Sequence, residues 1–379
     1  MKISFVIGSF GGGGAERVAS ILLNEWCKDY DVTVILTSAP QRHKYLLDSR
    51  IHVYYLSQKK IFAFRKINKL TRILSSIQPD VVISFLNAPN FYATIAANRL
   101  NIVNISSERN NPKFSPRNLF LRILRHIAFS RSSVVVFQTQ GAKKFFNSTI
   151  QQKSRIIPNP LAIEDSLLSL TRIIQNKIIA VGRLEKQKDY HVMLEAFAIF
   201  FERHKEFALE IYGEGESRNS ILEKAEKLGI SSAVFLKSFT SDIHSRMIES
   251  KIFLMSSKFE GFPNALLEAV ALGIPCVSTN CPPGSPSEII VGGVNGFLVD
   301  VGNSSQMANS MEKIISRYDD FILSSKLESQ KTREKYGLPN ILSQWDALFS
   351  DIGLQTKSNK NLKNATRIVK EMMINDKHH

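Results

Sequence analysis

Short apolar runs recur along the chain, separated by stretches in which apolar residues return at helical spacing. Continuous apolar runs of this length are typical of strands buried on both faces, as in a parallel sheet covered by helices. We interpret as strands Ile3 to Ile7, Val32 to Leu36, Ile102 to Ser106, Val134 to Thr139, Ala208 to Tyr212, Val234 to Ser238, Ile252 to Met255 and Ile274 to Thr279. Their alternation with helical patterns predicts an α/β protein.

Two helical patterns in the first half combine an apolar stripe with basic residues. Residues 59–77 place apolar residues on one side and basic residues off it, and residues 117–131 form a second basic amphipathic pattern. The stripe of the first is Phe64, Ile67, Leu70, Leu74 and Ile77, and its off-stripe basic residues are Lys66, Lys69 and Arg72. Such helices either dock on a sheet or contact a membrane surface through their basic rim.

Residues 303–318 and 340–351 are further predicted helices, and 294–299 (V-N-G-F-L-V) predict a hairpin turn at Asn-Gly.

Length and cysteine usage limit the class of protein. A chain of 379 residues with 44% hydrophobic residues suggests two packed domains. Cys27, Cys276 and Cys281 form no metal-ligand cluster and leave one cysteine unpaired, which indicates a reducing compartment. The opening M-K-I-S-F-V-I-G is too short for a signal-peptide core, and no apolar run approaches a bilayer-spanning length.

Positive charge is concentrated in the first half of the chain. Residues 1–165 contain 23 Lys and Arg against 9 Asp and Glu, whereas residues 166–351 contain 20 against 23. The whole chain has a formal net charge of +15. This asymmetry predicts an anionic partner for the first half: a membrane surface, a phosphorylated acceptor or nucleic acid.

The stretch from Ser256 to Ala271 (S-S-K-F-E-G-F-P-N-A-L-L-E-A-V-A) contains the most specific candidate chemistry. Gly261 and Pro263 predict a tight turn into a helix whose N-terminus favours an anion such as phosphate. Glu260 and Glu268 border this helix start, and carboxylates accept hydrogen bonds from sugar or ribose hydroxyls.

Three further segments place polar residues or glycines after predicted strands. Arg183 and Lys188, five residues apart, can reach one diphosphate. Glu108 and Arg109 follow the strand that ends at Ser106, at the sheet edge where open α/β folds bind ligands. A loop containing Gly12, Gly13 and Gly14 follows the first predicted strand. A nicotinamide-binding site would also require an acidic residue after the second predicted strand, and this chain has none there.

The motif E-G-F-P-N-A-L-L-E (260–268) resembles the E-x7-E signature of the family-4 retaining glycosyltransferases. G-R-L-x-x-x-K (182–188) resembles their diphosphate clamp, although Asp189 stands where Gly often follows the Lys. The resemblance implies the GT-B architecture, in which two Rossmann-like domains face each other across a cleft. It covers nearly the whole chain, strongly over residues 178–300 and loosely over residues 40–130.

The resemblance also assigns roles to residues of this chain. Glu260 would contact the donor sugar, Glu268 the ribose, and Arg183 and Lys188 the diphosphate. The other donor-side positions implied are Gly12, Gly13, Gly14, Gly213, Gly215, Lys237, Ser238, Gly261, Phe262, Pro263 and Asn264. Glu108 and Arg109 are acceptor-side candidates, and no metal or other cofactor is expected.

We therefore expect a glycosyltransferase that moves a hexose or N-acetylhexosamine, with retained configuration, from a nucleotide-sugar, expected to be UDP-linked. The expected acceptor is a lipid-linked oligosaccharide or surface polysaccharide (lipopolysaccharide or capsule) at the cytoplasmic membrane face. The alternatives are a sugar-nucleotide epimerase, a phosphorylase, for which we identify no cofactor lysine, and a non-enzymatic membrane- or nucleic-acid-binding protein. The expected domains are 1–165 for the acceptor and 166–351 for the nucleotide-sugar, the last helix crossing back to the first, with a basic, weakly ordered tail at 352–379.

Overall fold

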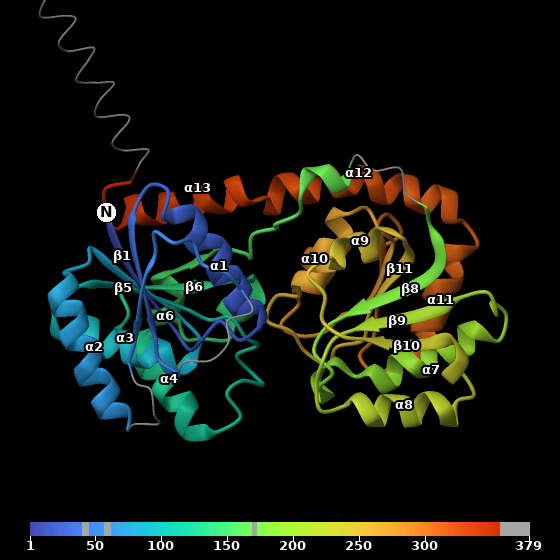
Figure 1. The fold of residues 1–379 in the computed structure, drawn as a ribbon, viewed down its shortest axis with the longest axis horizontal. Helices are drawn as coiled ribbons and strands as arrows, with labels where there is room; N and C mark the ends of the chain where they lie inside the picture. The colour runs from blue at the N-terminus through green and yellow to red at the C-terminus, as the bar shows by residue number, and fades with distance from the viewer. Residues whose placement is uncertain (40–44, 57–61, 169–172, 357–379) are drawn as a thin grey trace, which may run out of the picture. The chain divides into compact units, whose positions relative to one another are not determined.

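Two parallel sheets organise the chain, each within its own compact unit (Figure 1). A computed structural model describes residues 1–39, 45–56, 62–168 and 173–356. Unit 1 contains Met1–Pro160 together with the chain from Leu338 onward, and unit 2 contains Leu161–Gly337. Apart from its first residues, the tail expected at 352–379 lies outside the described residues, as do residues 59–61 of the first basic segment.

Unit 1 has a seven-stranded parallel sheet in the order β3-β2-β1-β4-β5-β6-β7. Its strands are β1 (Lys2–Ile7), β2 (Asp31–Leu36), β3 (His52–Tyr55), β4 (Val81–Phe85), β5 (Val103–Ser107), β6 (Val134–Phe137) and β7 (Ser154–Ile156). Its helices are α1 (Gly14–Trp26), α2 (Ala63–Ile77), α3 (Asn87–Arg99), α4 (Leu119–Arg131), α5 (Gln140–Lys144), α6 (Ser148–Gln152) and α13 (Leu338–Asp351). Helices α1 and α13 pack on one face of the sheet, and α2 and α3 on the other.

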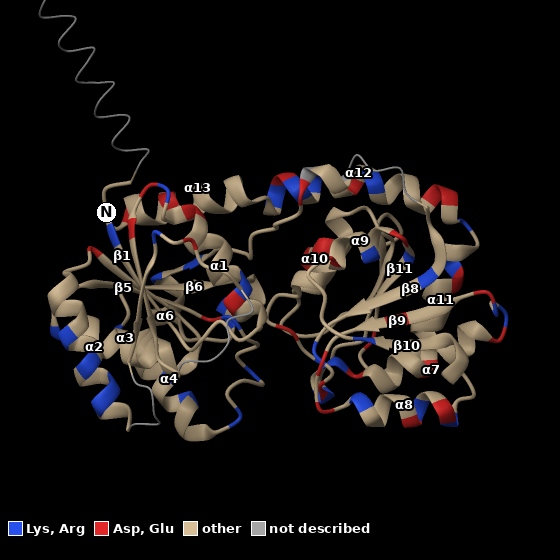
Figure 2. Ribbon diagram, viewed as in Figure 1, with Lys and Arg blue, Asp and Glu red and all other residues tan. Residues whose placement is uncertain are grey.

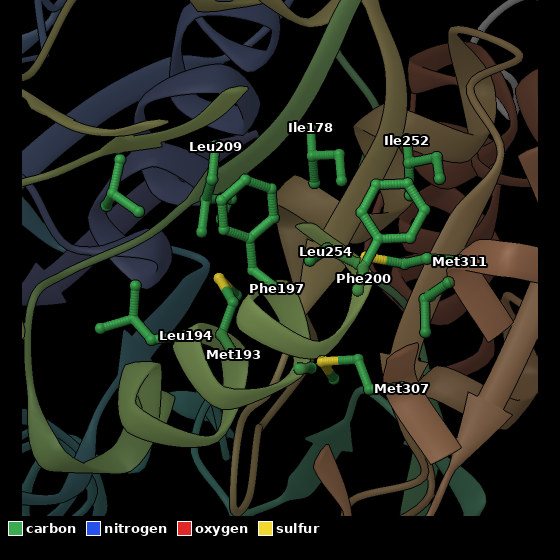
Figure 3. Packing of buried hydrophobic residues seen from close by; sticks show 14 of the residues in the cluster. Ile178, Met193, Leu194, Phe197, Phe200, Leu209, Ile252, Leu254, Met307 and Met311 are labelled. Carbon is green, nitrogen blue, oxygen red and sulfur yellow. The ribbon is translucent and has the colours of Figure 1, made fainter. Parts of the chain in front are cut away.

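Unit 2 has a six-stranded parallel sheet in the order β10-β9-β8-β11-β12-β13. Its strands are β8 (Gln175–Val181), β9 (Ala208–Tyr212), β10 (Val234–Lys237), β11 (Ser250–Met255), β12 (Cys276–Thr279) and β13 (Gly296–Val299). Its helices are α7 (Tyr190–Phe201), α8 (Arg218–Lys227), α9 (Ile243–Ile248), α10 (Asn264–Ala271), α11 (Ser304–Ile315) and α12 (Tyr318–Tyr336). Figure 3 shows Phe197 and Phe200 of α7 packing with Met307 and Met311 of α11 in the core of one face.

The division into units differs at its edges from the domains expected from the sequence. Leu161 donates its backbone N–H to the carbonyl of Tyr336 at 2.7 Å, so the chain joins unit 2 before residue 166. Unit 2 ends at Gly337, and the last helix, which was expected to cross back to the first domain, packs Trp345 and Phe349 of α13 against Trp26 in the core of unit 1.

One local interpretation of the sequence is wrong, and one helix was missed. Asn295 lies in a turn as expected, but Gly296–Val299 form a sixth strand parallel to β12 rather than a hairpin, and the Asn295 side chain accepts from the N–H of Val291 at 2.8 Å. The longest helix, α12, was missed. Its buried face contains Ser325, Ser329 and Thr332, so the segment lacks the apolar periodicity that predicts a helix.

The basic pattern at 62–77 packs as an ordinary helix over part of its length. Ile67, Leu70 and Leu74 of α2 are buried against the sheet, whereas Phe64 is 58% exposed. The second basic pattern forms α4, whose first residues also expose apolar side chains. Within the described residues, no helix combines the length and apolar character needed to cross a membrane.

Candidate active site

The sheet of unit 2 reverses its strand order between β8 and β11. After β8 the chain enters α7 on one face, and after β11 it enters α10 on the other. In open α/β sheets, ligands bind at the carboxyl ends of the strands at such a reversal. The loop after β8 contains Arg183 and Lys188, and the loop after β11 contains Glu260. The two most specific sequence motifs therefore follow the two strands that flank the reversal.

Lys188 and Glu260 form a short ion pair there. Lys188 Nζ lies 2.6 Å from Glu260 Oε1, and the two side chains are 19% and 9% exposed. The hydroxyl of Ser257, which is fully buried, donates to the same carboxylate oxygen at 2.6 Å. Burial, followed by the charge of Glu260, raises the pKa of the neighbouring Cys281 to about 12, so this thiol stays neutral. The result is a fixed charge pair in a largely dry setting.

Glycine at position 182 leaves the space that Lys188 needs. A Cβ on Gly182 would lie 3.1 Å from Lys188 Cε and 3.2 Å from the hydroxyl of Tyr190. That hydroxyl donates to the Gly182 carbonyl at 3.0 Å, and burial raises the pKa of Tyr190. A side chain at position 182 would therefore require Lys188 and Tyr190 to shift by a few tenths of an ångström.

The loops that follow β9 and β10 support the loop after β8 through hydrogen bonds. Gly182 donates to the carbonyl of Tyr212 at 3.0 Å, and Gly213 donates to that of Lys237 at 2.9 Å. A Cβ on Gly213 would lie 1.9 Å from the Gly182 carbonyl oxygen, and one on Gly215 would lie 2.4 Å from the Leu184 carbonyl oxygen. Only glycine permits this approach. The loops after β8, β9 and β10 thus form one hydrogen-bonded layer, with Lys237 and Ser238 exposed at its edge.

The helix start after Glu260 has the geometry expected of an anion-binding terminus. Pro263 is the N-cap of α10, whose first helical residue is Asn264, and proline supplies no side-chain hydrogen bond to the helix start. Gly261 is part of the turn, and Phe262 is buried with its ring centroid 5.8 Å from that of Tyr336. A helix start without a capping side chain directs N–H groups and partial positive charge toward its ligand side.

Glu268 lies on the second turn of α10 and is 5% exposed. Its Oε2 is 3.3 Å from Nε2 of His244, which belongs to α9. Arg183 is placed differently from Lys188: its side chain is 61% exposed and pairs with Glu185 at 2.7 Å. The structure therefore fixes Lys188 against Glu260, while Arg183 extends into solvent on the same loop.

In unit 1, the glycine loop after β1 is closed by a carboxylate. The N–H groups of Gly12 and Gly13 donate to Oε2 of Glu16 at 2.7 and 2.9 Å, and the Ser9 hydroxyl donates to its other oxygen at 2.6 Å. Gly14 is the first residue of α1. Two of the N–H groups expected to approach the donor diphosphate are therefore bonded to an anion that belongs to the chain itself.

Glu108 and Arg109 lie at the end of β5 and are both buried. Arg125 is 3.3 Å from Glu108, yet burial raises the pKa of Glu108 to about 7 and lowers the pKa of Arg109 to about 9. The Arg109 guanidinium lies 3.8 Å from the centroid of the Phe85 ring and donates to Asn159 at 2.8 Å. In this structure Arg109 braces the segment that leaves unit 1.

Comparisons with known proteins identify both halves of the chain. The family model described as "Glycosyltransferase Family 4" matches residues 12–165, and the model "Glycosyl transferases group 1" matches residues 173–334. The chain is a glycosyltransferase with a family-4 domain followed by a group 1 domain.

Similar proteins agree with this identification over almost the full length of the glycosyltransferase. A protein of Haemophilus influenzae named as an uncharacterized glycosyltransferase is 27% identical, covering 92% of this chain and 99% of that protein. A Campylobacter jejuni enzyme named as an α-1,4-N-acetyl-D-galactosaminyltransferase acting on an undecaprenol-linked saccharide is 24% identical, with coverages of 93% and 99%. The crystal structure of Anabaena Alr3699/HepE in complex with UDP has a TM-score of 0.78 at 18% identity, covering 93% and 100%, and supports the GT-B fold.

Sequence reasoning missed three polar residues of this glycosyltransferase that contact predicted site residues within their own unit. Ser257 lies three residues before Glu260, in the stretch singled out by the sequence, but no signal besides its position marks it. Glu16 follows the glycine loop, and its backward hydrogen bonds depend on the turn geometry. His244 comes from a helix that no motif marks. Among the described residues no group of three His, Cys, Asp or Glu side chains is arranged to hold a metal ion.

Proposed function

We propose that this glycosyltransferase transfers a hexose or N-acetylhexosamine from a UDP-sugar to a lipid-linked or surface-polysaccharide acceptor at the cytoplasmic face of the membrane. The Lys188–Glu260 pair at the strand reversal, beside the start of α10, is the observation that supports a nucleotide-sugar site most directly. A departing nucleoside diphosphate gains negative charge, which prearranged cations and helix dipoles stabilise. Lys188, Arg183 and the α10 N-terminus supply such groups on one unit.

The carboxylates suit the other parts of the donor. Glu260 is held by Lys188 and Ser257, so it orients sugar hydroxyls, and we assign it no role as a nucleophile. Glu268 accepts from the ribose hydroxyls. Two backbone sites in the same layer, Gly213 and Gly215, allow close approach of the nucleotide. Transfer with retained configuration follows from the resemblance of the 260–268 motif and is part of the proposal.

UDP and a polysaccharide or lipid-linked acceptor are supported by similar proteins. The Anabaena protein was crystallised with UDP, and a further structure of it with UDP-glucose. The Campylobacter relative is named for transfer onto an undecaprenol-linked saccharide, and an Erwinia amylovora relative of 24% identity is named for amylovoran biosynthesis. A lipid-linked acceptor requires the enzyme to work at a membrane surface.

Unit 1 has surface features that suit peripheral contact with an anionic membrane. The first residues of α4 expose Leu119 (72%), Phe120 (64%) and Leu121 (41%). Neither α4 nor α2 contains an acidic residue, and Figure 2 shows Lys and Arg along α2. Three basic residues of α2 (Arg65, Lys69 and Arg72) line a shallow surface depression. Apolar side chains beside basic ones are the usual combination for interfacial binding. We propose that the start of α4 and the basic residues of α2 contact the cytoplasmic leaflet of the membrane.

The test supplies the purified enzyme with radiolabelled UDP-, GDP-, ADP- and dTDP-sugars, with and without bacterial membrane lipid extract. The proposal predicts release of UDP that depends on extract, with label moving into the organic phase and an α-linkage in the product. Altered sugar without any acceptor would instead indicate an epimerase. Turnover of none of the donors, together with salt-sensitive binding to nucleic acid, would refute a transferase of this type.

A further inference from the structure

His244 lies beside Glu268 although the two residues come from different helices. His244 is the second residue of α9, and Glu268 lies in the middle of α10. Both helices pack on the same face of the unit 2 sheet, through Met247 and Ile248 of α9 and Leu266 and Leu267 of α10 (Figure 1). The side chains of His244 and Glu268 are 14% and 7% exposed. The ring and the carboxylate are therefore held together by the packing of their helices.

The ring nitrogen that faces Glu268 has unused hydrogen-bonding capacity. Nε2 of His244 is 3.3 Å from Glu268 Oε2, and it is buried without a hydrogen-bond partner among the described residues. A buried polar atom left unpaired is costly, and a small rotation of the ring or of the carboxylate completes this bond. The ring therefore limits the positions that the Glu268 carboxylate can adopt.

A second His–Glu pair in the same unit provides a comparison. His204 Nε2 lies 3.0 Å from Glu312 Oε2, with side chains 20% and 30% exposed. His204 follows the carboxyl end of α7 and precedes β9, so this pair lies at the amino ends of the strands. His244 lies between β10 and β11 in the chain and begins the helix that follows the carboxyl end of β10. The His244–Glu268 pair is thus the one at the edge where a ligand binds.

We propose that His244 is a positioning residue that fixes the Glu268 carboxylate for the donor ribose, so that part of the affinity for the nucleotide depends on this ring. This inference rests on the proposed role of Glu268 at the ribose. The ring acts through Glu268: a carboxylate held in one orientation loses less freedom when it accepts from the two ribose hydroxyls. The role is one of geometry and hydrogen bonding and requires no proton transfer.

The test measures binding of UDP and of 2′,3′-dideoxy-UDP by calorimetry to the full chain and its variants. His244→Leu should weaken UDP binding about fivefold, the loss of one modest hydrogen bond, and should leave 2′,3′-dideoxy-UDP binding unchanged because that ligand lacks the hydroxyls. His244→Gln, which retains an N–H near the position of Nε2, should restore most of the affinity. His204→Leu, the matched control, should bind both ligands as the wild type does.

A double variant separates this inference from the proposed function. Glu268→Ala should weaken UDP binding about tenfold or more, and adding His244→Leu to it should cause no further loss. If Glu268→Ala binds UDP normally, the ribose role of Glu268 is wrong. If Glu268→Ala fails as expected while His244→Leu binds UDP normally, only the inference about His244 is wrong. Equal weakening of both nucleotides by His244→Leu and by His244→Gln would also overturn it, since that result indicates a general structural effect.

Discussion

Lys188 Nζ lies 2.6 Å from Glu260 Oε1, although 72 residues of sequence separate the two. The contact joins the loop after β8 to the loop after β11, and the strand order of the sheet reverses between these two strands. The two loops thus hold a cation and a carboxylate close together. Charged groups prearranged in this way can stabilise charge that develops in a transition state.

The close approach of Gly213 to Gly182 leads to a stability prediction. Gly213→Ala places a Cβ 1.9 Å from a backbone oxygen that has no freedom to move, so the loops must separate. We expect a loss of about 3 kcal/mol in the free energy of unfolding, at the upper end for overpacking, and a loss of donor binding. Gly292→Ala, where the added Cβ meets nothing within 4 Å, is the control. Chemical unfolding followed by circular dichroism measures both, and equal stability of the two variants would contradict the account.

Asp189 occupies a left-handed backbone conformation, with φ of 49°, at the N-cap of α7. This explains why the family often has glycine here, since glycine adopts such angles without strain. Asp189→Gly should stabilise the protein by about 0.5–1 kcal/mol, reduced by a few tenths for the lost ion pair to the half-exposed Lys258. Thermal unfolding checks this. Asp189→Ala, which keeps the strain and loses the ion pair, should be less stable than the wild type.

Glu108 makes the stability of unit 1 depend on pH. Burial raises its pKa from the ordinary value of 4.5 to about 7, so between these values the folded chain keeps a proton that the unfolded chain loses. Stability therefore falls as pH rises from about 4.5 to about 7, by about 3 kcal/mol at most. The glutamine of Glu108→Gln cannot ionise, and its side-chain oxygen can still accept from the backbone N–H groups of Arg109 and Asn110. The variant should gain stability relative to wild type as pH rises.

Fluorescence-detected urea unfolding at pH 5 and pH 7 provides the measurement. Trp26 and Trp345 are the two tryptophans of the chain, and both lie in the core of unit 1, so the signal reports this unit. The difference between variant and wild type should be larger at pH 7. A difference that is independent of pH would mean that Glu108 ionises normally in the folded protein.

The exposed start of α4 should affect membrane binding. Replacing Leu119 and Phe120 by Ser should weaken sedimentation with phosphatidylglycerol vesicles about tenfold or more, because each large apolar side chain contributes about 1.5–3 kcal/mol on burial. The control replaces Leu323 and Leu327 of α12, which are 63% and 66% exposed, by Ser. Unchanged binding of the α4 variant, or equal loss in the α12 variant, would exclude α4 as the membrane contact.

Local sequence signals predicted the elements around the site well. The strand ending at Met255 and the helix beginning at Asn264 were both identified, because Gly261 and Pro263 mark the turn between them. By contrast, α12 buries serine and threonine, and its helical conformation depends on tertiary contacts such as the hydrogen bond from Arg333 to the Ala271 carbonyl at 2.7 Å. A buried face made of serine and threonine gives no apolar periodicity in the sequence, so it does not predict a helix.

The residues of the candidate site were likewise identified from the sequence only in part. The resemblance to a known family identified Glu260, Glu268 and Lys188, but their contacts depend on sheet order, which the sequence does not state. Glu16 and His244 have no motif of their own, and their importance appears only through distances across loops and helices. The donor roles of Glu260, Glu268, Lys188 and Arg183 stay predictions.

The central claim is that unit 2 binds a nucleoside diphosphate at Lys188. The most direct measurement is the thermal shift of wild type and Lys188→Met with UDP, uridine, GDP, ADP and dTDP, each with and without EDTA. Lys224→Met removes a lysine from another 2.6 Å ion pair, with Glu195, and is the control. We predict that UDP raises the unfolding temperature of wild type and control, with and without EDTA. In Lys188→Met this shift should be absent, or the affinity for UDP should be about tenfold weaker. Stabilisation of Lys188→Met by UDP equal to that of wild type, or no stabilisation of wild type by any nucleotide, would contradict the assignment.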